Sequence, residues 1–163
     1  MIVVGYQGIG KSTLAGKDNC IDLESGNFWV NGFREKNWYK PYCQIANHLS
    51  EQGYTVFVSS HEVVRKELEK SKEDVVIIYP SLTLKYQWIE KLKTRYENTE
   101  LVKDFKAWQN AKEMYSQNIE DLSDFDRAVK YGFIRYEIGG MNYELSKIIA
   151  QIKTNLEYRK RDE

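Results

Sequence analysis

The sequence predicts a three-layer α/β fold in which a five-stranded parallel sheet is flanked by helices. Short β-type runs alternate along the chain with segments of helical periodicity, and this alternation is typical of a parallel sheet covered by helices. The run at 75–79 is the most apolar of them, as expected for a strand that is buried on both faces. No repeat or linker divides the 163 residues, so we expect residues 1–163 to form a single domain.

The first half of the chain contains three of the predicted strands. We expect strands at 2–4, 20–23 and 55–58, and helices at 11–16 and 41–52, with a further charged helix after the third strand. Pro41 fits the first turn of its helix, and Gly53 is placed to end it. The aromatic and polar segment 26–40 has no clear period, which indicates a loop or a small lid.

The second half of the chain is more helical. We expect strands at 75–79 and 133–138, and helices at 82–96, 101–122 and 141–156. Apolar and aromatic side chains follow a 4-3 spacing from Leu101 to Leu122, which we interpret as a packing face. The charged tail at 157–163 predicts a frayed end.

The composition argues against several classes of protein. The 24 Lys and Arg residues balance 24 Asp and Glu residues, so the chain has no global field for holding nucleic acid or an anionic membrane. No stretch approaches the roughly 20 apolar residues that span a bilayer, and the N-terminus lacks a secretory signal. Cys20 and Cys43 do not make a disulfide framework. We therefore expect a cytoplasmic protein with no membrane partner.

Residues 5–13, Gly-Tyr-Gln-Gly-Ile-Gly-Lys-Ser-Thr, match the phosphate-binding P-loop pattern at every position. Glycines let backbone N–H groups converge on phosphate oxygens, and the following helix directs its positive end at the same anion. We expect ATP to be bound by Gly8, Ile9, Gly10, Lys11, Ser12 and Thr13. In such a loop Lys11 reaches the β- and γ-phosphates, and the Ser12 hydroxyl ligates Mg²⁺.

The additional glycine, Gly8, gives a loop that resembles the P-loop kinases, which include the nucleoside monophosphate, shikimate and gluconate kinases. The resemblance implies a P-loop NTPase fold with a five-stranded parallel sheet and a helical lid between strands 4 and 5. It also implies ATP as donor, Mg²⁺ as cofactor and a small-molecule acceptor. The short chain, with its motif at the N-terminus, is similar in style to phage and prophage nucleotide-metabolism proteins.

In these kinases an acidic residue often follows the second strand, and here Asp22 and Glu24 have that place. They are two residues apart, so both would face one side if the strand continued. The resemblance gives Asp22 a catalytic role, in which it accepts a proton from a substrate hydroxyl, and places Glu24 at the acceptor. With a phosphate acceptor, an acidic residue would instead organise metal or ribose. The alternative for both residues is contact with solvent alone.

The family binds its acceptor in the stretch after the second strand, where this chain has Phe28, Trp29 and Arg34. A base would stack on the aromatic rings, and Arg34 would donate a bidentate pair of hydrogen bonds to a phosphate. The alternative is a small hydrophobic cluster with a surface arginine.

The family also has a cationic lid after the fourth strand. Lys91 and Arg95 lie one helical turn apart in the segment 82–96, and Arg95 borders the apolar face. The resemblance makes Arg95 the catalytic candidate, stabilising charge on the transferring phosphoryl group. A solvated charged face is the alternative.

The third strand ends at Ser59 and Ser60 without the acidic residue that motor ATPases and signalling GTPases carry there, which argues against both classes. We interpret His61 as the start of a helix. Gly139 and Gly140 fall where the family has its adenine-binding loop, although an ordinary turn explains them equally well.

Three functions therefore compete. The first is an ATP-dependent phosphotransferase acting on a nucleoside or nucleotide, which includes a nucleoside monophosphate kinase. The second is a P-loop kinase whose acceptor is another small molecule or a polynucleotide 5′-hydroxyl. The third is a nucleotide-binding protein without kinase turnover.

Overall fold

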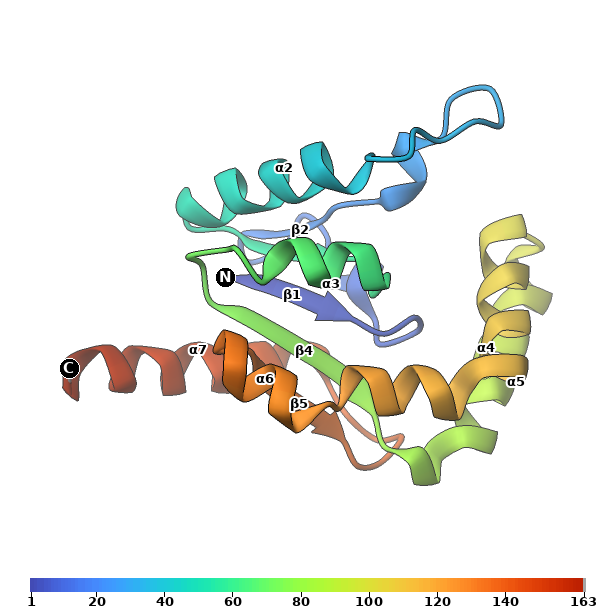
Figure 1. Ribbon diagram of the computed structural model, residues 1–163. Coiled ribbons are helices and arrows are strands. Elements are labelled where there is room, and N and C mark those ends of the chain that lie inside the picture. The colour runs from blue at the N-terminus through green and yellow to red at the C-terminus, as the bar shows by residue number, and fades with distance from the viewer. Residues whose placement is uncertain (163) are drawn as a thin grey trace.

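The computed structural model describes residues 1–162 and has a five-stranded, all-parallel sheet with helices on both faces (Figure 1). The strands are β1 (Ile2–Gly5), β2 (Cys20–Asp22), β3 (Thr55–Val58), β4 (Val75–Pro80) and β5 (Ile134–Ile138). The α-helices are α1 (Lys11–Leu14), α2 (Tyr39–Glu51), α3 (Glu62–Leu68), α4 (Lys85–Thr99), α5 (Val102–Leu122), α6 (Phe125–Tyr131) and α7 (Leu145–Asp162). Two 3-10 turns, η1 (Ser25–Phe28) and η2 (Leu82–Leu84), complete the elements. The predicted α/β class is confirmed.

The strand order is β2-β3-β1-β4-β5, so β1 lies at the centre of the sheet. Val3 of β1 is in register with Phe57 of β3 on one side and with Val76 of β4 on the other. Every residue of β1, β3 and β4 is buried, because helices exclude water from both faces. The predicted strands at 2–4, 55–58 and 75–79 are therefore confirmed, and 75–79 is an internal strand as expected.

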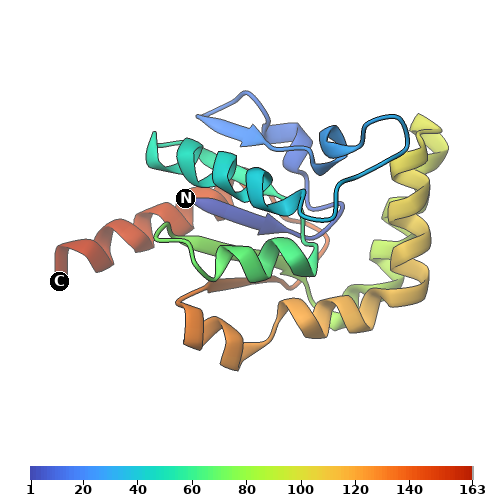
Figure 2. The ribbon, with the colours of Figure 1, turned by 45° about the horizontal axis from the view of Figure 1, so that its top comes forward.

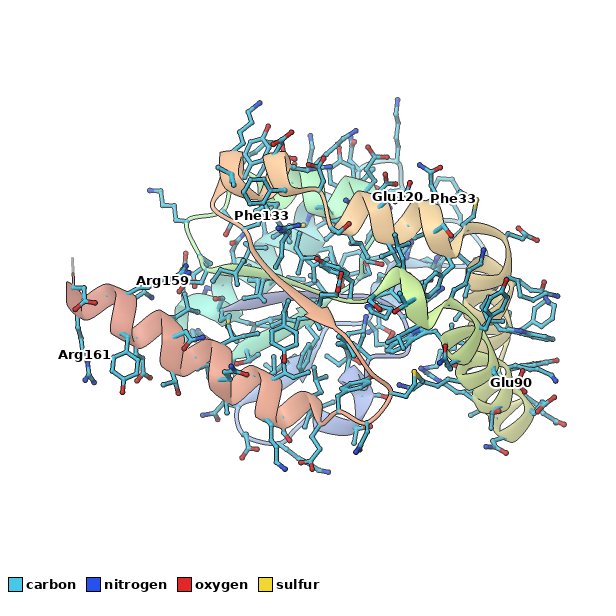
Figure 3. All side chains as sticks on the ribbon, turned by 90° about the horizontal axis from the view of Figure 1, so that it is seen from below. Phe33, Glu90, Glu120, Phe133, Arg159 and Arg161 are labelled. Atoms are coloured by element: carbon cyan, nitrogen blue, oxygen red, sulfur yellow. The ribbon has the colours of Figure 1, made fainter. Side chains whose placement is uncertain are left out.

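The helices cover the two faces unequally. The helices α2, α3 and α6 lie on one face, and α7 lies along the other beside α1 (Figures 1 and 3). The strand arrows point toward α4 and α5, which form a hairpin that stands across the carboxyl ends of the strands (Figure 2). The segment between β2 and α2 folds over the same edge of the sheet. A parallel sheet presents its functional groups at this edge.

The helix ends differ from the predictions in several places. The segment 82–96 divides into η2 and α4, and α7 begins at Leu145 instead of at 141. The tail was expected to fray, but α7 continues to Asp162; Leu156 packs against the core, and Lys160 pairs with Asp74 at 2.9 Å. Residue 163 lies outside the described residues.

Helix α6 was not predicted at all. The side chain of Asp124 caps it by accepting the N–H of Arg127 at 3.0 Å, and Gly132 ends it with φ of +70°. Both are ordinary helix-end signals. The helix is only seven residues long, too short for its apolar period to stand out.

The expected packing face of α5 is confirmed in its second half, where Tyr115, Ile119 and Leu122 are buried. In its first half the ring of Phe105 packs 5.2 Å from that of Tyr96 of α4 but stays partly exposed, and Leu101, which precedes the helix, is exposed. The helix bends, so that its first half pairs with α4 and its second half runs along the sheet (Figure 2). None of the helices within residues 1–162 combines the length and apolarity needed to cross a bilayer.

Candidate functional site

The loop from Gly5 to Thr13, called here the glycine loop, connects the central strand β1 to α1. Its Gly8 and Gly10 have φ of +85° and +107°, in the left-handed region that side chains with a Cβ rarely adopt. A Cβ on Gly8 would also lie 2.9 Å from Leu92 Cδ2 and 3.3 Å from Trp88 Nε1 of α4. Glycine is required at position 8 because the loop is left-handed there and α4 packs directly on it.

A cavity of about 230 Å³, called here the loop cavity, lies beside the glycine loop. It brings together seven of the residues singled out in the sequence: Gly8, Gly10, Lys11, Ser12, Asp22, Glu24 and Arg95. The side chain of Ile9 is buried in the core, and Thr13 does not line the cavity. Ile9 can therefore serve a ligand here only through its backbone.

Lys11 is the cation that the glycine loop itself contributes to this cavity. Its Nζ donates a hydrogen bond to the carbonyl of Gly5 at 3.1 Å, and an ammonium group has two further protons to donate. Burial lowers the pKa of Lys11, and the carboxylates of Asp22 and Glu24 oppose that shift. The two carboxylates therefore favour the protonated, phosphate-binding form of the side chain.

Asp22 ends β2 and is partly buried beside Lys11. Burial raises the pKa of Asp22, while Lys11 lowers it. A carboxylate with a raised pKa is a better proton acceptor than one in water, provided that it remains ionised at neutral pH. Glu24 lies on the same side of the cavity and pairs with Lys103 of α5 at 3.7 Å.

Arg95 reaches the loop cavity from α4 and is held there by Asp104 of α5. The Nε of Arg95 donates to Asp104 Oδ1 at 2.8 Å, and the Thr99 hydroxyl donates to Asp104 Oδ2 at 2.5 Å. Asp104 is only 2% exposed, so it is a fixed acceptor that restricts the guanidinium. Asp104 could not be identified from the sequence, because it and Arg95 are on different helices.

Lys91, the other lid candidate, is bound elsewhere. Its Nζ donates to the Tyr143 hydroxyl at 2.9 Å and lies 4.4 Å from the centre of the Trp88 ring. The Tyr143 hydroxyl donates to the carbonyl of Ile9 at 3.0 Å, and the Trp88 indole N–H donates to the carbonyl of Gln7 at 2.9 Å. These contacts fix the outer side of the glycine loop to α4 and to the segment before α7.

Gln7 extends the same attachment to α5. Its Nε2 donates to the carbonyl of Ala107 at 2.9 Å and to Asn110 Oδ1 at 3.1 Å. The glycine loop therefore contacts both helices of the hairpin.

A second cavity of about 760 Å³, called here the outer cavity, adjoins the first. Its walls include the expected acceptor residues Glu24, Trp29 and Arg34. The fourth, Phe28, points elsewhere: its ring packs 5.5 Å from that of Tyr42 and 6.0 Å from that of Trp38. For Phe28 the structure favours the hydrophobic-cluster alternative over contact with a ligand.

The expected adenine-loop position also lines a hollow. Gly139, Gly140, Asn142 and Tyr143 border a cavity of about 320 Å³ between β5 and α7. Tyr143 links this hollow to the glycine loop through its hydrogen bond to Ile9. Burial raises the pKa of Tyr143 to about 12, so its hydroxyl stays protonated at neutral pH.

His61 precedes α3 as its N-cap residue, as predicted. Its Nδ1 lies 2.8 Å from the Ser59 hydroxyl. Burial lowers the pKa of His61, and the charges of Arg34 and Lys11 lower it further. The ring is therefore neutral at pH 7 and links Ser59 in the loop cavity to the wall of the outer cavity.

No protein-family model matches this chain, and no curated protein matches it either.

Proposed function

We propose that this chain is an ATP-dependent phosphotransferase of the P-loop kinase type, whose acceptor is a nucleoside or nucleotide. The observation that carries the proposal is the loop cavity, where Lys11, Asp22 and Arg95 meet from three different elements beside the glycine loop. Phosphoryl transfer needs cations around the phosphates and a group that handles the acceptor proton. These three side chains supply both.

The position of the glycine loop in the sheet supports the same assignment. Helix α1, which follows β1, and α3, which follows the neighbouring β3, lie on opposite faces of the sheet. In open parallel sheets, ligands bind outside the carboxyl ends of two such strands. The glycine loop and Ser59 occupy that crevice.

The proposed reaction proceeds by in-line attack. The oxygen of an acceptor hydroxyl attacks the γ-phosphorus of ATP, and the bond from that phosphorus to the β,γ-bridging oxygen breaks, releasing ADP with the electron pair. The hydroxyl proton passes to the carboxylate of Asp22. Lys11 and Arg95 stabilise the charge on the phosphate oxygens.

Magnesium fits the oxygen groups at this position. Within residues 1–162, no three His, Cys, Asp or Glu side chains are grouped for holding a metal, and Mg²⁺ in kinases is commonly held by one or two side chains together with substrate phosphates. The Ser12 hydroxyl and the phosphates would hold the ion, with Asp22 beside its water. It would neutralise phosphate charge. The two buried free thiols, Cys20 and Cys43, are typical of the cytoplasm, where we place the reaction.

The decisive experiment measures ADP release with ATP, Mg²⁺ and a panel of nucleosides, nucleoside monophosphates, polyols and short 5′-hydroxyl oligonucleotides. One base-bearing acceptor should accelerate ADP release, and the Lys11→Ala variant should lose about 10²- to 10³-fold of that rate. The exposed Lys17 lies outside the loop cavity, so Lys17→Ala is the matched control and should retain the rate.

Two results would refute this proposal. Full turnover in Lys11→Ala would remove the glycine loop from the reaction. ATP that stabilises the fold while no acceptor on the panel accelerates its consumption would leave a nucleotide-binding protein without kinase activity.

A further inference from the structure

The outer cavity contains a buried arginine to which the sequence analysis assigned no function. Arg65 of α3 lines this cavity and is only 6% exposed. Its Nε donates to the carbonyl of Ser60 at 3.1 Å, and one terminal nitrogen donates to the carbonyl of Asp121 at 3.2 Å. No carboxylate of the described residues lies within ion-pair distance of this guanidinium. Its direct hydrogen bonds are therefore made to neutral carbonyl groups.

A second guanidinium faces the same cavity from the segment between β2 and α2. Arg34 donates to the carbonyl of Ser25 at 2.5 Å and stacks 3.8 Å from the centre of the Trp38 ring. Its Nε is buried without a hydrogen-bond partner among the described residues. A buried donor on a charged group is unfavourable without a partner, and an oxygen of a ligand anion would supply one.

The carboxylates of the outer cavity do not neutralise these two arginines. Glu24 pairs with Lys103, and Glu62 pairs with Lys66. Asp121 is exposed and contacts Arg65 through its backbone carbonyl. Lys106 adds a further cation to the wall.

The two cavities share the cation Lys103 but differ in their arginines. Lys11 and Arg95 line the loop cavity, whereas Arg34 and Arg65 line only the outer cavity. The residues common to both are Gln7, Glu24, Ser25, Lys103 and Ala107. An anion on Arg34 and Arg65 thus lies beyond this shared wall, away from the cations around the transferred phosphoryl group.

We infer that Arg34 and Arg65 bind a phosphate of the acceptor that does not itself react, so the acceptor is a nucleotide phosphorylated through one of its hydroxyls. Guanidinium groups suit this task because they offer paired, planar donors to phosphate oxygens. Trp29, 52% exposed at the same wall, offers its ring to the base. A volume of about 760 Å³ is ample for a mononucleotide.

This inference rests on the proposed function for the reaction itself, but the binding site can be tested without turnover. The probes are adenosine, its 3′-monophosphate and its 5′-monophosphate, titrated calorimetrically into the protein with a non-hydrolysable ATP analogue present. At least one monophosphate should bind about 10-fold tighter than adenosine. Arg34→Gln and Arg65→Gln should each abolish that advantage and leave adenosine binding within about two-fold of wild type.

Lys36→Gln is the matched control, since Lys36 is exposed in the same segment as Arg34 and lines neither cavity. It should preserve the advantage of the monophosphate. Arg65→Gln removes the hydrogen bonds to the carbonyls of Ser60 and Asp121, which support the fold. If that variant does not fold, the result for Arg34→Gln, which lies in a surface segment, decides the test. The same titrations in Lys11→Ala should retain the dependence on Arg34.

Three results would overturn the inference. The first is equal binding of adenosine and both monophosphates. The second is an unchanged advantage of the monophosphate in folded Arg34→Gln. The third comes from incubation with ATP in place of the analogue: conversion of the 5′-monophosphate to its diphosphate, with loss of that product in Arg34→Gln, because the bound phosphate would then be the reacting one. Failure of the proposed function looks different: no probe would be phosphorylated, yet the binding differences would remain.

Discussion

Replacing Gly8 with alanine should destabilise the protein for two separable reasons. The residue has φ of +85°, and a non-glycine residue in the left-handed region costs about 1–2 kcal/mol. Alanine recovers about 0.4–1 kcal/mol of this through the smaller entropy of the unfolded chain. The new Cβ would also meet Leu92 Cδ2 at 2.9 Å and Trp88 Nε1 at 3.3 Å, and such overpacking costs about 1–3 kcal/mol. The expected loss is about 1.5–4.5 kcal/mol.

Gly53 separates these two contributions. Its φ is +91°, but a Cβ there would meet nothing within 4 Å. Gly53→Ala should therefore show the backbone cost alone, about 0.5–1.5 kcal/mol. The difference between the two variants measures how closely α4 packs on the glycine loop.

Urea denaturation followed by circular dichroism gives both free energies of unfolding, provided that the m-values of the variants agree. Truncation of the contacting side chain supplies a further check. The double variant Gly8→Ala with Leu92→Ala should lose less than the sum of its two single variants, because the clash is then absent. Equal losses for Gly8→Ala and Gly53→Ala would show that α4 does not pack on the loop.

Three further results are expected. Asp104→Asn weakens the ion pair with Arg95 and should lower the free energy of unfolding by about 1–2 kcal/mol, a modest loss because Arg95 keeps access to water. Glu90→Gln breaks an exposed pair with Lys93 on the outer side of α4 (Figure 3) and should cost less than about 0.5 kcal/mol in the same urea titration. Equal costs for the two variants would contradict the structure. The pKa of His61 is lowered by burial, so the unfolded chain binds more protons below pH 6.5 and stability falls as pH decreases through that range. His61→Asn removes the titratable ring, places a residue favoured at the N-cap position, and should show a shallower decrease in unfolding midpoints from pH 7 to 5; parallel decreases would exclude His61 as the cause. Burial raises the pKa of Cys43 to about 12 and also raises the pKa of Cys20. A thiol reagent at pH 8 should therefore react with neither thiol in the folded protein and with both in urea. Rapid reaction of the folded protein would contradict the burial of the two thiols.

Strands were predicted well because a buried strand is a run of consecutive apolar or β-branched residues, which is visible in the sequence. The run Thr55–Val58 was predicted at its observed bounds, since four consecutive apolar or β-branched residues fit a strand that is covered on both faces. The glycine loop was located for a similar reason, because its glycines, lysine and serine lie within nine consecutive residues. Patterns within one short segment can be recognised without knowing how distant segments pack.

Features that depend on distant segments could not be predicted. Asp104 is an ordinary acidic residue of an amphipathic helix until the hairpin brings it to Arg95. Arg65 looks like one of several charges on α3 until the fold brings its guanidinium to the carbonyl of Asp121 in α5. Phe28 was expected at a ligand because the resemblance to kinases places the acceptor in this stretch, but its ring packs against those of Tyr42 and Trp38. In each case the deciding partner lies on another element or further along the chain.

The hydrogen bond from the Trp88 indole to the carbonyl of Gln7 also gives the protein an internal optical probe. Indole emission shifts with the polarity and hydrogen bonding around the ring, and this ring is buried against the glycine loop. The chain has four tryptophans, so replacing Trp29, Trp38 and Trp108 with phenylalanine would isolate the signal of Trp88. Stopped-flow mixing of that variant with nucleotide would then follow any rearrangement of the loop in real time, without an attached dye.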